Sequence, residues 1–365
     1  MKIAFYGSSL LSSYWNGAAT YYRGLLSDLA GRGHRITFYE PDAFDRQQHR
    51  DIDPPPYANV KVYPATEEAL HAVVAEAAQA DVVVKASGVG IFDDELLEGV
   101  LGAARPDAIR IFWDVDAPAT LSEIRENPDH ALHRALPALD LVLTYGGGPP
   151  VVTAYEGFGA RRCIPIYNAL DPATHHPVPP EPRFAADLAF LGNRLPDREA
   201  RVETFFLDAA SRLSDRHFLL GGSGWESRDL PSNVHHLGHV YTREHNAFNT
   251  TPLAVLNIAR DSMAAVGYSP ATRVFEAAGA GACLITDAWE GIELFLEPGR
   301  EVLVARDGGE VFGDLTPERA RAIGAAARAR ITAEHTYARR GAEVDAILRA
   351  EALRKGTLAP ARSVA

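Results

Sequence analysis

The chain alternates short apolar runs with longer segments of helical periodicity, and this alternation restricts the fold more than any other feature. In the first part of the chain the apolar runs lie at residues 2–6, 35–39, 60–63, 81–85, 108–113 and 141–145. Between two of them, in residues 67–78, apolar side chains recur at spacings near 3.6. Continuous apolar strands separated by helices indicate a parallel sheet that is covered on both faces. We therefore expect a doubly wound α/β domain.

A proline-rich segment interrupts this pattern. Residues 168–184 contain five prolines and no periodic apolar face, which is typical of a linker. Apolar runs then return at residues 188–191, 217–220, 253–258, 282–286 and 301–304. A chain of 365 residues is long enough for two domains. Two such domains leave a cleft at the carboxyl ends of their strands, where open α/β sheets bind ligands.

The expected domain bounds follow from these patterns. We predict an N-terminal Rossmann-like domain over residues 1–168, a linker over 169–184, a second Rossmann-like domain over 185–336, a C-terminal helix over 337–353 and a tail over 354–365.

Charge and cysteine content exclude several classes of function. A net charge of -12 argues against a nucleic-acid-binding protein, because neutralising phosphates requires clustered Lys and Arg. A local basic pocket for a small phosphate ligand is still allowed. Cys163 and Cys283 each lie in an apolar run and are expected to be buried free thiols of a reducing compartment. The apolar run at residues 3–6 is too short for a signal peptide or a transmembrane segment, so we expect a cytoplasmic protein.

The loop after the first expected strand, residues 7–17, lacks the glycine fingerprint of dinucleotide-binding proteins. An NAD site is therefore disfavoured. The small hydroxyls of this loop precede a helix and could hold a sugar or a phosphate, or the segment could be a plain surface loop.

Two aspartates stand at the end of the fifth expected strand. Asp114 and Asp116 form a D-x-D pattern, but the further ligands that a metal ion needs are not apparent, and we predict no metal site. Either residue could cap the following helix or act as a catalytic acid or base at the carboxyl end of the strand. The spacing alone does not rank them.

Residues that could bind an anion follow the first strands of the second domain. Gly192, Asn193, Arg194 and Arg198 lead from a strand into a helix that is expected to begin near Pro196. Backbone N–H groups and two arginines at a helix N-terminus suit a diphosphate, although arginines on a plain surface give the same pattern. Gly222 and Ser223 lie in the glycine-rich turn after the next strand.

A helix rich in alanine and glycine precedes the strand at residues 282–286. Ser269 is a suitable N-cap and Pro270 suits the first helical position. Arg273 and Glu276 then lie on one face. They could form an ordinary surface ion pair, or Glu276 could accept hydrogen bonds from a ribose diol while Arg273 binds phosphate.

Several segments, in this order along the chain, resemble a known family. They are FWDVDAPATL (112–121), TYGGGPPV (144–151), YNALDPATHHP (167–177), FLGNRLPDR (190–198), the segment 238–261, SPATRVFEAAGAGACLITD (269–287) and GIELFLEPGREVLVA (291–305). The chain resembles the nucleotide-sugar glycosyltransferases of the GT-B fold, most closely the spore-maturation (CgeB-like) group. The resemblance assigns Glu276 to the donor ribose, and it assigns Arg194, Arg198, Arg273 and the preceding Gly192 to the donor diphosphate. It also implies that the final helix packs back on the first domain.

The chain departs from that family at one position. Many retaining relatives carry a glutamate eight residues before the ribose-binding one, and here that position is Tyr268. A retaining mechanism therefore cannot be carried over, although Tyr268 stays among the candidate donor contacts. An inverting enzyme would need a general base, for which Asp114 and Asp116 are the candidates.

These patterns lead to one expected function and two alternatives. We expect a metal-independent glycosyltransferase that uses a nucleoside-diphosphate sugar, with uridine as the favoured base, and no obligatory cofactor. The acceptor, a glycan, a small molecule or a protein, is not indicated. A non-hydrolysing nucleotide-sugar epimerase or a non-catalytic nucleotide-sugar-binding protein would fit the same pattern.

Overall fold

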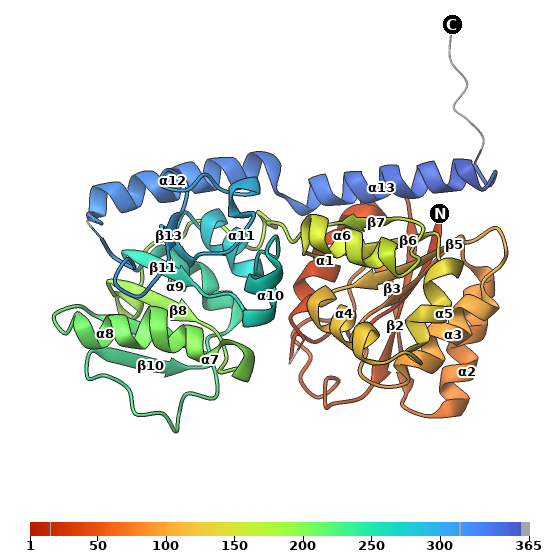
Figure 1. Ribbon diagram of the computed structural model, residues 1–365, viewed down its shortest axis with the longest axis horizontal. Helices are drawn as coiled ribbons and strands as arrows, with labels where there is room; N and C mark the ends of the chain where they lie inside the picture. The colour runs from red at the N-terminus through yellow and green to blue at the C-terminus, as the bar shows by residue number, and fades with distance from the viewer. Residues whose placement is uncertain (15, 314, 359–365) are drawn as a thin grey trace, which may run out of the picture. The chain divides into compact units, whose positions relative to one another are not determined.

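A computed structural model describes residues 1–14, 16–313 and 315–358, and the chain divides into two compact units (Figure 1). The first unit consists of residues 1–167 together with the chain from Tyr337 onward, and the second spans Asn168–Thr336. The predicted tail lies outside the described residues from position 359 on.

The first unit is built on a seven-stranded sheet in which every neighbouring pair of strands is parallel. The strands are β1 (Lys2–Tyr6), β2 (Arg35–Asp42), β3 (Ala58–Pro64), β4 (Val82–Ala86), β5 (Ile109–Asp114), β6 (Leu141–Thr144) and β7 (Cys163–Pro165). Their order in the sheet is β3-β2-β1-β4-β5-β6-β7. This order reverses direction between β1 and β4, as in the Rossmann fold.

Helices cover both faces of this sheet (Figure 1). They are α1 (Ala18–Gly31), α2 (Glu67–Ala75), α3 (Asp93–Ala103), α4 (Ala117–Glu126), α5 (Ala131–Ala135), α6 (Gly148–Gly157) and α13 (Tyr337–Arg354), with short 3-10 turns at Glu76–Gln79 and Leu136–Ala138. Side chains of β1 alternate between the faces, because successive residues of a strand point to opposite sides. Tyr6 packs among residues of α2 and α3, whereas Phe5 faces α1 and α13.

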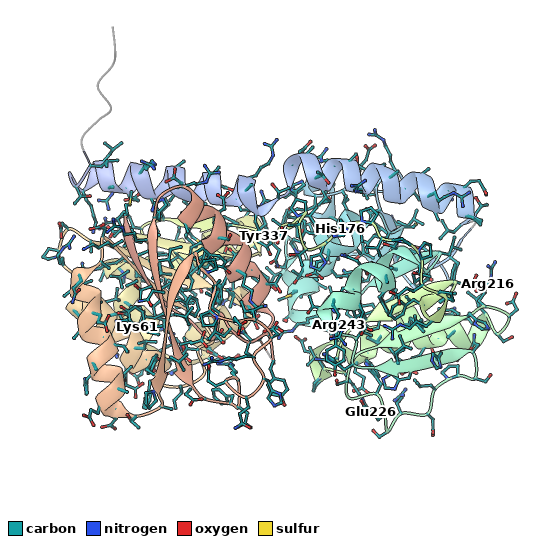
Figure 2. The ribbon with its side chains drawn as sticks, turned by 180° about the vertical axis from the view of Figure 1, so that it is seen from behind. Lys61, His176, Arg216, Glu226, Arg243 and Tyr337 are labelled. Atoms are coloured by element: carbon teal, nitrogen blue, oxygen red, sulfur yellow. The ribbon has the colours of Figure 1, made fainter. Side chains whose placement is uncertain are left out.

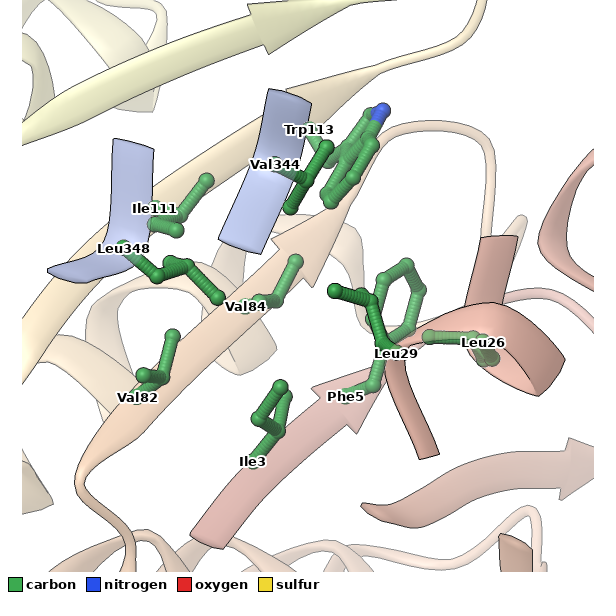
Figure 3. A pocket seen from close by; sticks show the side chains of 10 residues that line it. All are labelled: Ile3, Phe5, Leu26, Leu29, Val82, Val84, Ile111, Trp113, Val344 and Leu348. Carbon is green, nitrogen blue, oxygen red and sulfur yellow. The ribbon is translucent and has the colours of Figure 1, made fainter. Parts of the chain in front are cut away.

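The C-terminal helix α13 lies beside α1 on the sheet of the first unit. Figure 3 shows the small apolar cavity left beneath the two helices, where Val344 of α13 lies near Val84 and Trp113 of the sheet. Its volume of about 10 Å³ is at most that of one water molecule, and its apolar walls give a water no hydrogen-bond partner. At the far end of the helix, Arg354 donates to Oδ1 of the buried Asp140 at 2.6 Å.

The second unit repeats the architecture with six parallel strands. They are β8 (Leu188–Leu191), β9 (Phe218–Gly221), β10 (Val234–Gly238), β11 (Ala254–Asn257), β12 (Leu284–Asp287) and β13 (Leu303–Ala305), in the order β10-β9-β8-β11-β12-β13. The order reverses between β8 and β11, so the loops after these two strands meet at one edge of the sheet.

Six α-helices accompany this sheet in the described residues. They are α7 (Pro196–Val202), α8 (Asp208–Arg212), α9 (His245–Thr250), α10 (Asp261–Val266), α11 (Thr272–Gly279) and α12 (Pro317–Glu334), and a π-helical turn, η4 (Glu203–Leu207), joins α7 to α8. Shorter 3-10 turns lie at Pro182–Phe184, Thr242–Glu244 and Ile292–Leu294. Phe190 of β8 packs against Phe206 on one face of the sheet, while Leu191 packs near Phe248 of α9 on the other.

The prediction of two doubly wound parallel sheets is confirmed, but two strands were missed and one helix was misplaced at its start. The missed strands, β7 and β10, are edge strands: β7 has only three residues and ends in a proline, and the sequence of β10, VHHLG, contains two histidines. Helix α11 begins at Thr272, so the predicted cap at Ser269 and first turn at Pro270 are wrong. Ser269 instead donates its hydroxyl to the Gly267 carbonyl, and the backbone stays extended through Ala271. Among the described residues, no helix is long and apolar enough to cross a membrane.

Candidate functional site

The loops after β8 and β9 are joined by hydrogen bonds, and they bring most of the predicted anion-binding residues together. The backbone N–H of Arg194 donates to the Ser223 carbonyl at 2.9 Å. The backbone N–H of Ser223 donates to the side-chain oxygen of Asn193 at 3.0 Å. Trp225, which is buried, donates its indole N–H to the Gly192 carbonyl at 2.9 Å. The two turns therefore form one rigid edge at the carboxyl ends of their strands.

Gly222 is required where these turns cross. Its φ is +118°, and a Cβ atom at this position would lie 2.3 Å from the Gly192 carbonyl oxygen. No side chain can be accommodated at that distance, so a larger residue would force the turns apart.

Arg198 carries a partly buried positive charge that forms no ion pair with a carboxylate within the described part of the chain. Its guanidinium lies over the Phe190 ring at 5.6 Å and donates one N–H to the Asn193 carbonyl, while Nε is buried and unbonded. Burial and the positive charges of Arg273 and Arg260 together lower the pKa of Arg198 to about 10, while the charges of Asp287 and Asp197 oppose the shift. An anion bound here would relieve both effects.

Arg273, on the first turn of α11, has even fewer partners. Its guanidinium makes no hydrogen bond or ion pair with any residue that the structure describes, and one of its terminal nitrogens is fully buried. Burial lowers the pKa of Arg273, and the nearby charge of Glu276 opposes that shift. Arg198 and Arg273 therefore form a pair of neighbouring cations that can hold an anion between them.

Arg194 differs from these two arginines. Its guanidinium is bonded to the Glu199 carboxylate at 2.6 Å, and both side chains are partly exposed. Its charge is already neutralised in the unliganded protein, so its role at a diphosphate stays a prediction. A fourth arginine, Arg260 in the loop after β11, donates to Asp197 at 2.9 Å. This bond ties the loop after β11 to the start of α7.

Glu276 lies in the middle of α11 and is only 9% exposed. No ion pair joins it to Arg273 within the described residues, so the alternative of an ordinary surface pair does not describe these two side chains. Its carboxylate lies beside His175, whose Nε2 is 3.5 Å from Oε1. The charge of Glu276 also reaches His245 on α9. A buried carboxylate with one oxygen toward a histidine can accept further hydrogen bonds from a polar ligand.

Tyr268 precedes α11 in an unusual backbone conformation. Its φ is +50°, in the left-handed region that non-glycine residues rarely adopt. Two bonds to one residue hold it there, since its N–H donates to the Glu290 carbonyl at 2.6 Å and its hydroxyl donates to the Glu290 carboxylate at 2.9 Å. Strain of this kind persists only where the surroundings enforce it.

In the first unit, the two candidate bases have different surroundings. Asp114 is completely buried, and its Oδ1 accepts from the Asp116 N–H and the Thr120 hydroxyl, both at 3.0 Å. Its Oδ2 accepts from the buried Tyr155 hydroxyl. Burial raises the pKa of Asp114. Asp116, at the N-cap position of α4, is partly exposed as a residue, although its Oδ1 is buried.

Polar groups of the serine-rich loop after β1 form hydrogen bonds with other protein groups. Glu40, buried at the end of β2, accepts from the Ser9 hydroxyl at 3.0 Å and from the Leu10 N–H at 2.6 Å. Ser8 donates to Asn16 at 3.0 Å. The loop is thus held by a buried carboxylate, which favours a structural role over sugar or phosphate binding. Among the described residues, no group of three or more His, Cys, Asp and Glu side chains could hold a metal ion.

Comparison with known proteins identifies the architecture. Residues 198–346 match the family described as glycosyl transferase-like. The HepE protein of Anabaena, solved with UDP-glucose, aligns with a TM-score of 0.67 at 14% identity over 96% of this chain and 100% of that chain. Sucrose-phosphate synthase from Thermosynechococcus elongatus aligns with a TM-score of 0.67 at 13% identity over 96% and 98%. The fold is that of the GT-B glycosyltransferases. Among curated proteins, none matches the sequence.

A third GT-B structure supports the same conclusion. A glycosyltransferase of Rickettsia africae aligns with a TM-score of 0.63 at 10% identity, over 96% of this chain and 98% of that chain. At identities this low, the structural likeness establishes the GT-B fold but assigns no role to individual residues of this chain.

Within this GT-B fold, three residues near the candidate site were missed by the sequence analysis. His175 lies in the proline-rich segment that was interpreted as a linker. His245 and Arg260 lie in the quoted segment 238–261, but nothing in their spacing singles them out. All three reach the site through contacts between segments that are far apart in the chain, for which a sequence pattern carries no signal.

Proposed function

We propose that this protein is a glycosyltransferase that transfers a sugar from a nucleoside-diphosphate donor, with UDP as the favoured nucleotide, to an acceptor that the first unit binds. The second unit serves as the donor side and the first as the acceptor side. The observation that carries this proposal is the pair of neighbouring cations, Arg198 and Arg273, which has no carboxylate partner among the described residues.

A diphosphate fits this pair of arginines better than a ligand with one negative charge does. Both guanidinium groups are partly or fully removed from water, where an uncompensated charge is costly. A diphosphate supplies several oxygens for the unbonded N–H groups and neutralises both cations. As the donor bond breaks, negative charge grows on the departing diphosphate, and fixed cations stabilise that charge most in the transition state.

Glu276 supports the ribose part of the proposal. Its carboxylate is buried one turn from Arg273 on the same helix, so a ligand bound to the arginine extends past the glutamate. A carboxylate can accept two hydrogen bonds from a vicinal diol. The HepE structures contain UDP or UDP-glucose, which are ligands with a diphosphate and a ribose.

The catalytic chemistry is proposed from the first unit. We assign the general base to Asp116, because this residue is partly exposed while Asp114 is completely buried and both of its oxygens accept hydrogen bonds. This base would remove the proton of an acceptor hydroxyl in an inverting reaction. Tyr268 stands where a retaining relative would carry glutamate, which favours inversion. Arg198, Arg273 and backbone N–H groups would supply the positive charge, so we propose that no metal ion is needed.

Two finer assignments belong with the proposal. The motifs quoted from residues 190–198 and 269–287 favour the spore-maturation (CgeB-like) group within the GT-B glycosyltransferases. Cys163 and Cys283 are buried free thiols, which suits a reducing compartment such as the cytoplasm.

A ligand titration tests the donor assignment. UDP, uridine and pyrophosphate would each be titrated into the wild-type protein and into Glu276→Ala by calorimetry. We expect Glu276→Ala to lower the affinity for UDP and for uridine by about tenfold, because hydrogen bonds to a charged group are lost. The affinity for pyrophosphate should not change. Unaltered UDP affinity in this variant would refute the ribose assignment.

A turnover assay then separates the catalytic alternatives. Incubation with UDP-sugars and a broad acceptor panel should release UDP only when an acceptor is present. Isomerisation of the donor sugar in the absence of an acceptor would instead identify an epimerase. Tight UDP binding with no donor consumed across the panel would identify a binding protein that has lost catalysis.

A further inference from the structure

The proline-rich segment 168–184 contributes a buried side chain to the donor site of the second unit. His175 is 3% exposed, although its neighbours in the segment are mostly exposed. A turn fixes it, because the backbone N–H of His175 donates to the Asp171 carbonyl at 2.9 Å. Asn246 of α9 binds this turn twice, donating to the Thr174 carbonyl at 2.9 Å and accepting from the His176 N–H at 3.2 Å. The segment is therefore anchored where it passes the site.

The His175 ring faces the Glu276 carboxylate. Nε2 lies 3.5 Å from Oε1 of Glu276, a contact that is an ion pair when the ring is protonated, and no other ionic contact of Glu276 occurs within the described residues. On the other side, the ring lies nearly parallel to that of His245, with centroids 6.4 Å apart. Nδ1 is buried without a partner among the described residues. The interactions of the ring are therefore directed at Glu276 and at His245, rather than at the polar groups of its own segment.

We propose that His175 is a positioning residue for the donor. It holds one oxygen of the Glu276 carboxylate, and thereby presents the other oxygen to the ribose hydroxyls of a nucleoside diphosphate. This inference rests on the proposed function and deepens it, because it names the part of the donor whose recognition depends on the proline-rich segment.

The physical reason is the freedom of a glutamate side chain. Glu276 has three rotatable bonds, and a carboxylate without a fixed partner samples several rotamers, of which only some face a ligand. A buried ring beside Oε1 removes most of these alternatives before the ligand arrives. Preorganisation of this kind raises affinity by reducing the ordering cost of binding. The effect should be confined to the ligand group that Glu276 contacts.

The experiment compares two ligands that differ only at the ribose. Calorimetric Kd values for UDP and for 2′,3′-dideoxyuridine 5′-diphosphate would be measured with wild type, Glu276→Ala, His175→Ala, His175→Gln and the control His176→Ala. His176, labelled in Figure 2, is the exposed neighbour of His175 in the same segment. The ratio of the two Kd values within one variant does not depend on the folded fraction, so a destabilised variant is still informative.

The expected results are specific to the ribose. Wild type should prefer UDP over the dideoxy compound, and His175→Ala should reduce this preference about tenfold while the Kd of the dideoxy compound stays within about twofold. His175→Gln, which keeps an N–H donor within reach of Glu276, should recover most of the preference. His176→Ala should match wild type.

Two kinds of failure are distinguishable. If wild type and Glu276→Ala differ in their preference for UDP but His175→Ala equals wild type, the positioning role is overturned and the donor assignment stands. An equal loss of preference in His176→Ala would also overturn it, because the effect would then belong to the segment as a whole. If wild type itself does not distinguish the two ligands, the ribose assignment fails and this inference fails with it.

Discussion

Arg273 and Glu276 lie one turn apart on α11, yet no hydrogen bond or ion pair joins them in the described structure. In a ligand-free protein this separation costs free energy, because a buried guanidinium is left without an anionic partner. Both side chains stay available to a ligand as a result. The arrangement implies that the charge of Arg273 lowers the stability of the fold and raises the affinity for the donor.

Replacing Arg273 should therefore have opposite effects on stability and on binding. Arg273→Met keeps the bulk and removes the buried charge, so the melting temperature of the ligand-free protein should rise by about 2 °C. UDP affinity should fall by about 100-fold, because a charge-assisted contact to phosphate is lost. Scanning calorimetry and titration with UDP measure the two quantities. Arg194→Met is the matched control, since Arg194 is already paired with Glu199 and should show a smaller loss of affinity. A destabilised Arg273→Met would contradict this account.

Substitutions of Asp114 and Asp116 in the first unit should have different effects on catalysis and on stability. Asp116→Asn should lower kcat by about 100-fold or more with little change in KM for the donor, because it removes a general base. Asp114→Asn should instead lower the free energy of unfolding by about 2 kcal/mol, since an amide cannot accept all the hydrogen bonds that the carboxylate receives. Steady-state kinetics and urea denaturation measure these effects. A kinetic defect in Asp114→Asn at unchanged stability would move the role of base to Asp114.

His245 should make stability depend on pH. Burial lowers the pKa of His245 to about 4, with the charge of Glu276 opposing the shift and that of Arg273 reinforcing it. The unfolded chain has a value of about 6.5, so between pH 6.5 and 4 the unfolded state binds more protons than the folded state. Stability should therefore fall as the pH is lowered through this window, by on the order of 2 to 3 kcal/mol. His245→Gln should lose this component in urea denaturation series at pH 7, 6, 5 and 4. Equal pH slopes for the variant and wild type would rule out the assignment.

Metal removal should leave the reaction intact. In the proposed site, cationic side chains and backbone N–H groups stabilise the departing diphosphate. Activity measured after dialysis against EDTA should equal that of the untreated protein, and added Mn²⁺ or Mg²⁺ should change kcat by less than about twofold. Complete loss of activity that Mn²⁺ restores would show that the reaction requires a metal ion.

The sequence pattern was sufficient for the fold because parallel strands buried on both faces leave continuous apolar runs. β1 and β8 are such strands. β10 was not predicted, because its sequence, VHHLG, is only partly buried at the edge of the sheet and forms no apolar run. The start of α11 could not be placed either. Pro270 and Ser269 match a general preference, but the backbone around Tyr268 is fixed by bonds to Glu290, which is distant in sequence.

The candidate site was predictable in part for a topological reason. Residues that follow the strands at a reversal of strand order meet at one edge, so the loop that contains Gly192 and Asn193 could be predicted to lie at that edge, while its role at a diphosphate stays a prediction. Whether an arginine is paired, as Arg194 is, depends on rotamers and neighbours that no periodicity encodes. His175 illustrates the same limit, because its segment has no regular structure from which a facing residue could be predicted.

The return of the chain to the first unit at Tyr337 has a consequence for biosynthesis. Residues 168–336 are all translated before α13, so the second unit can fold while the sheet of the first unit still lacks one of its covering helices. At about 5–20 residues per second, the apolar face around Phe5, Val84 and Trp113 stays uncovered on the ribosome for on the order of ten seconds or more. A nascent chain stalled ahead of Tyr337 therefore displays a surface of the kind that chaperones bind.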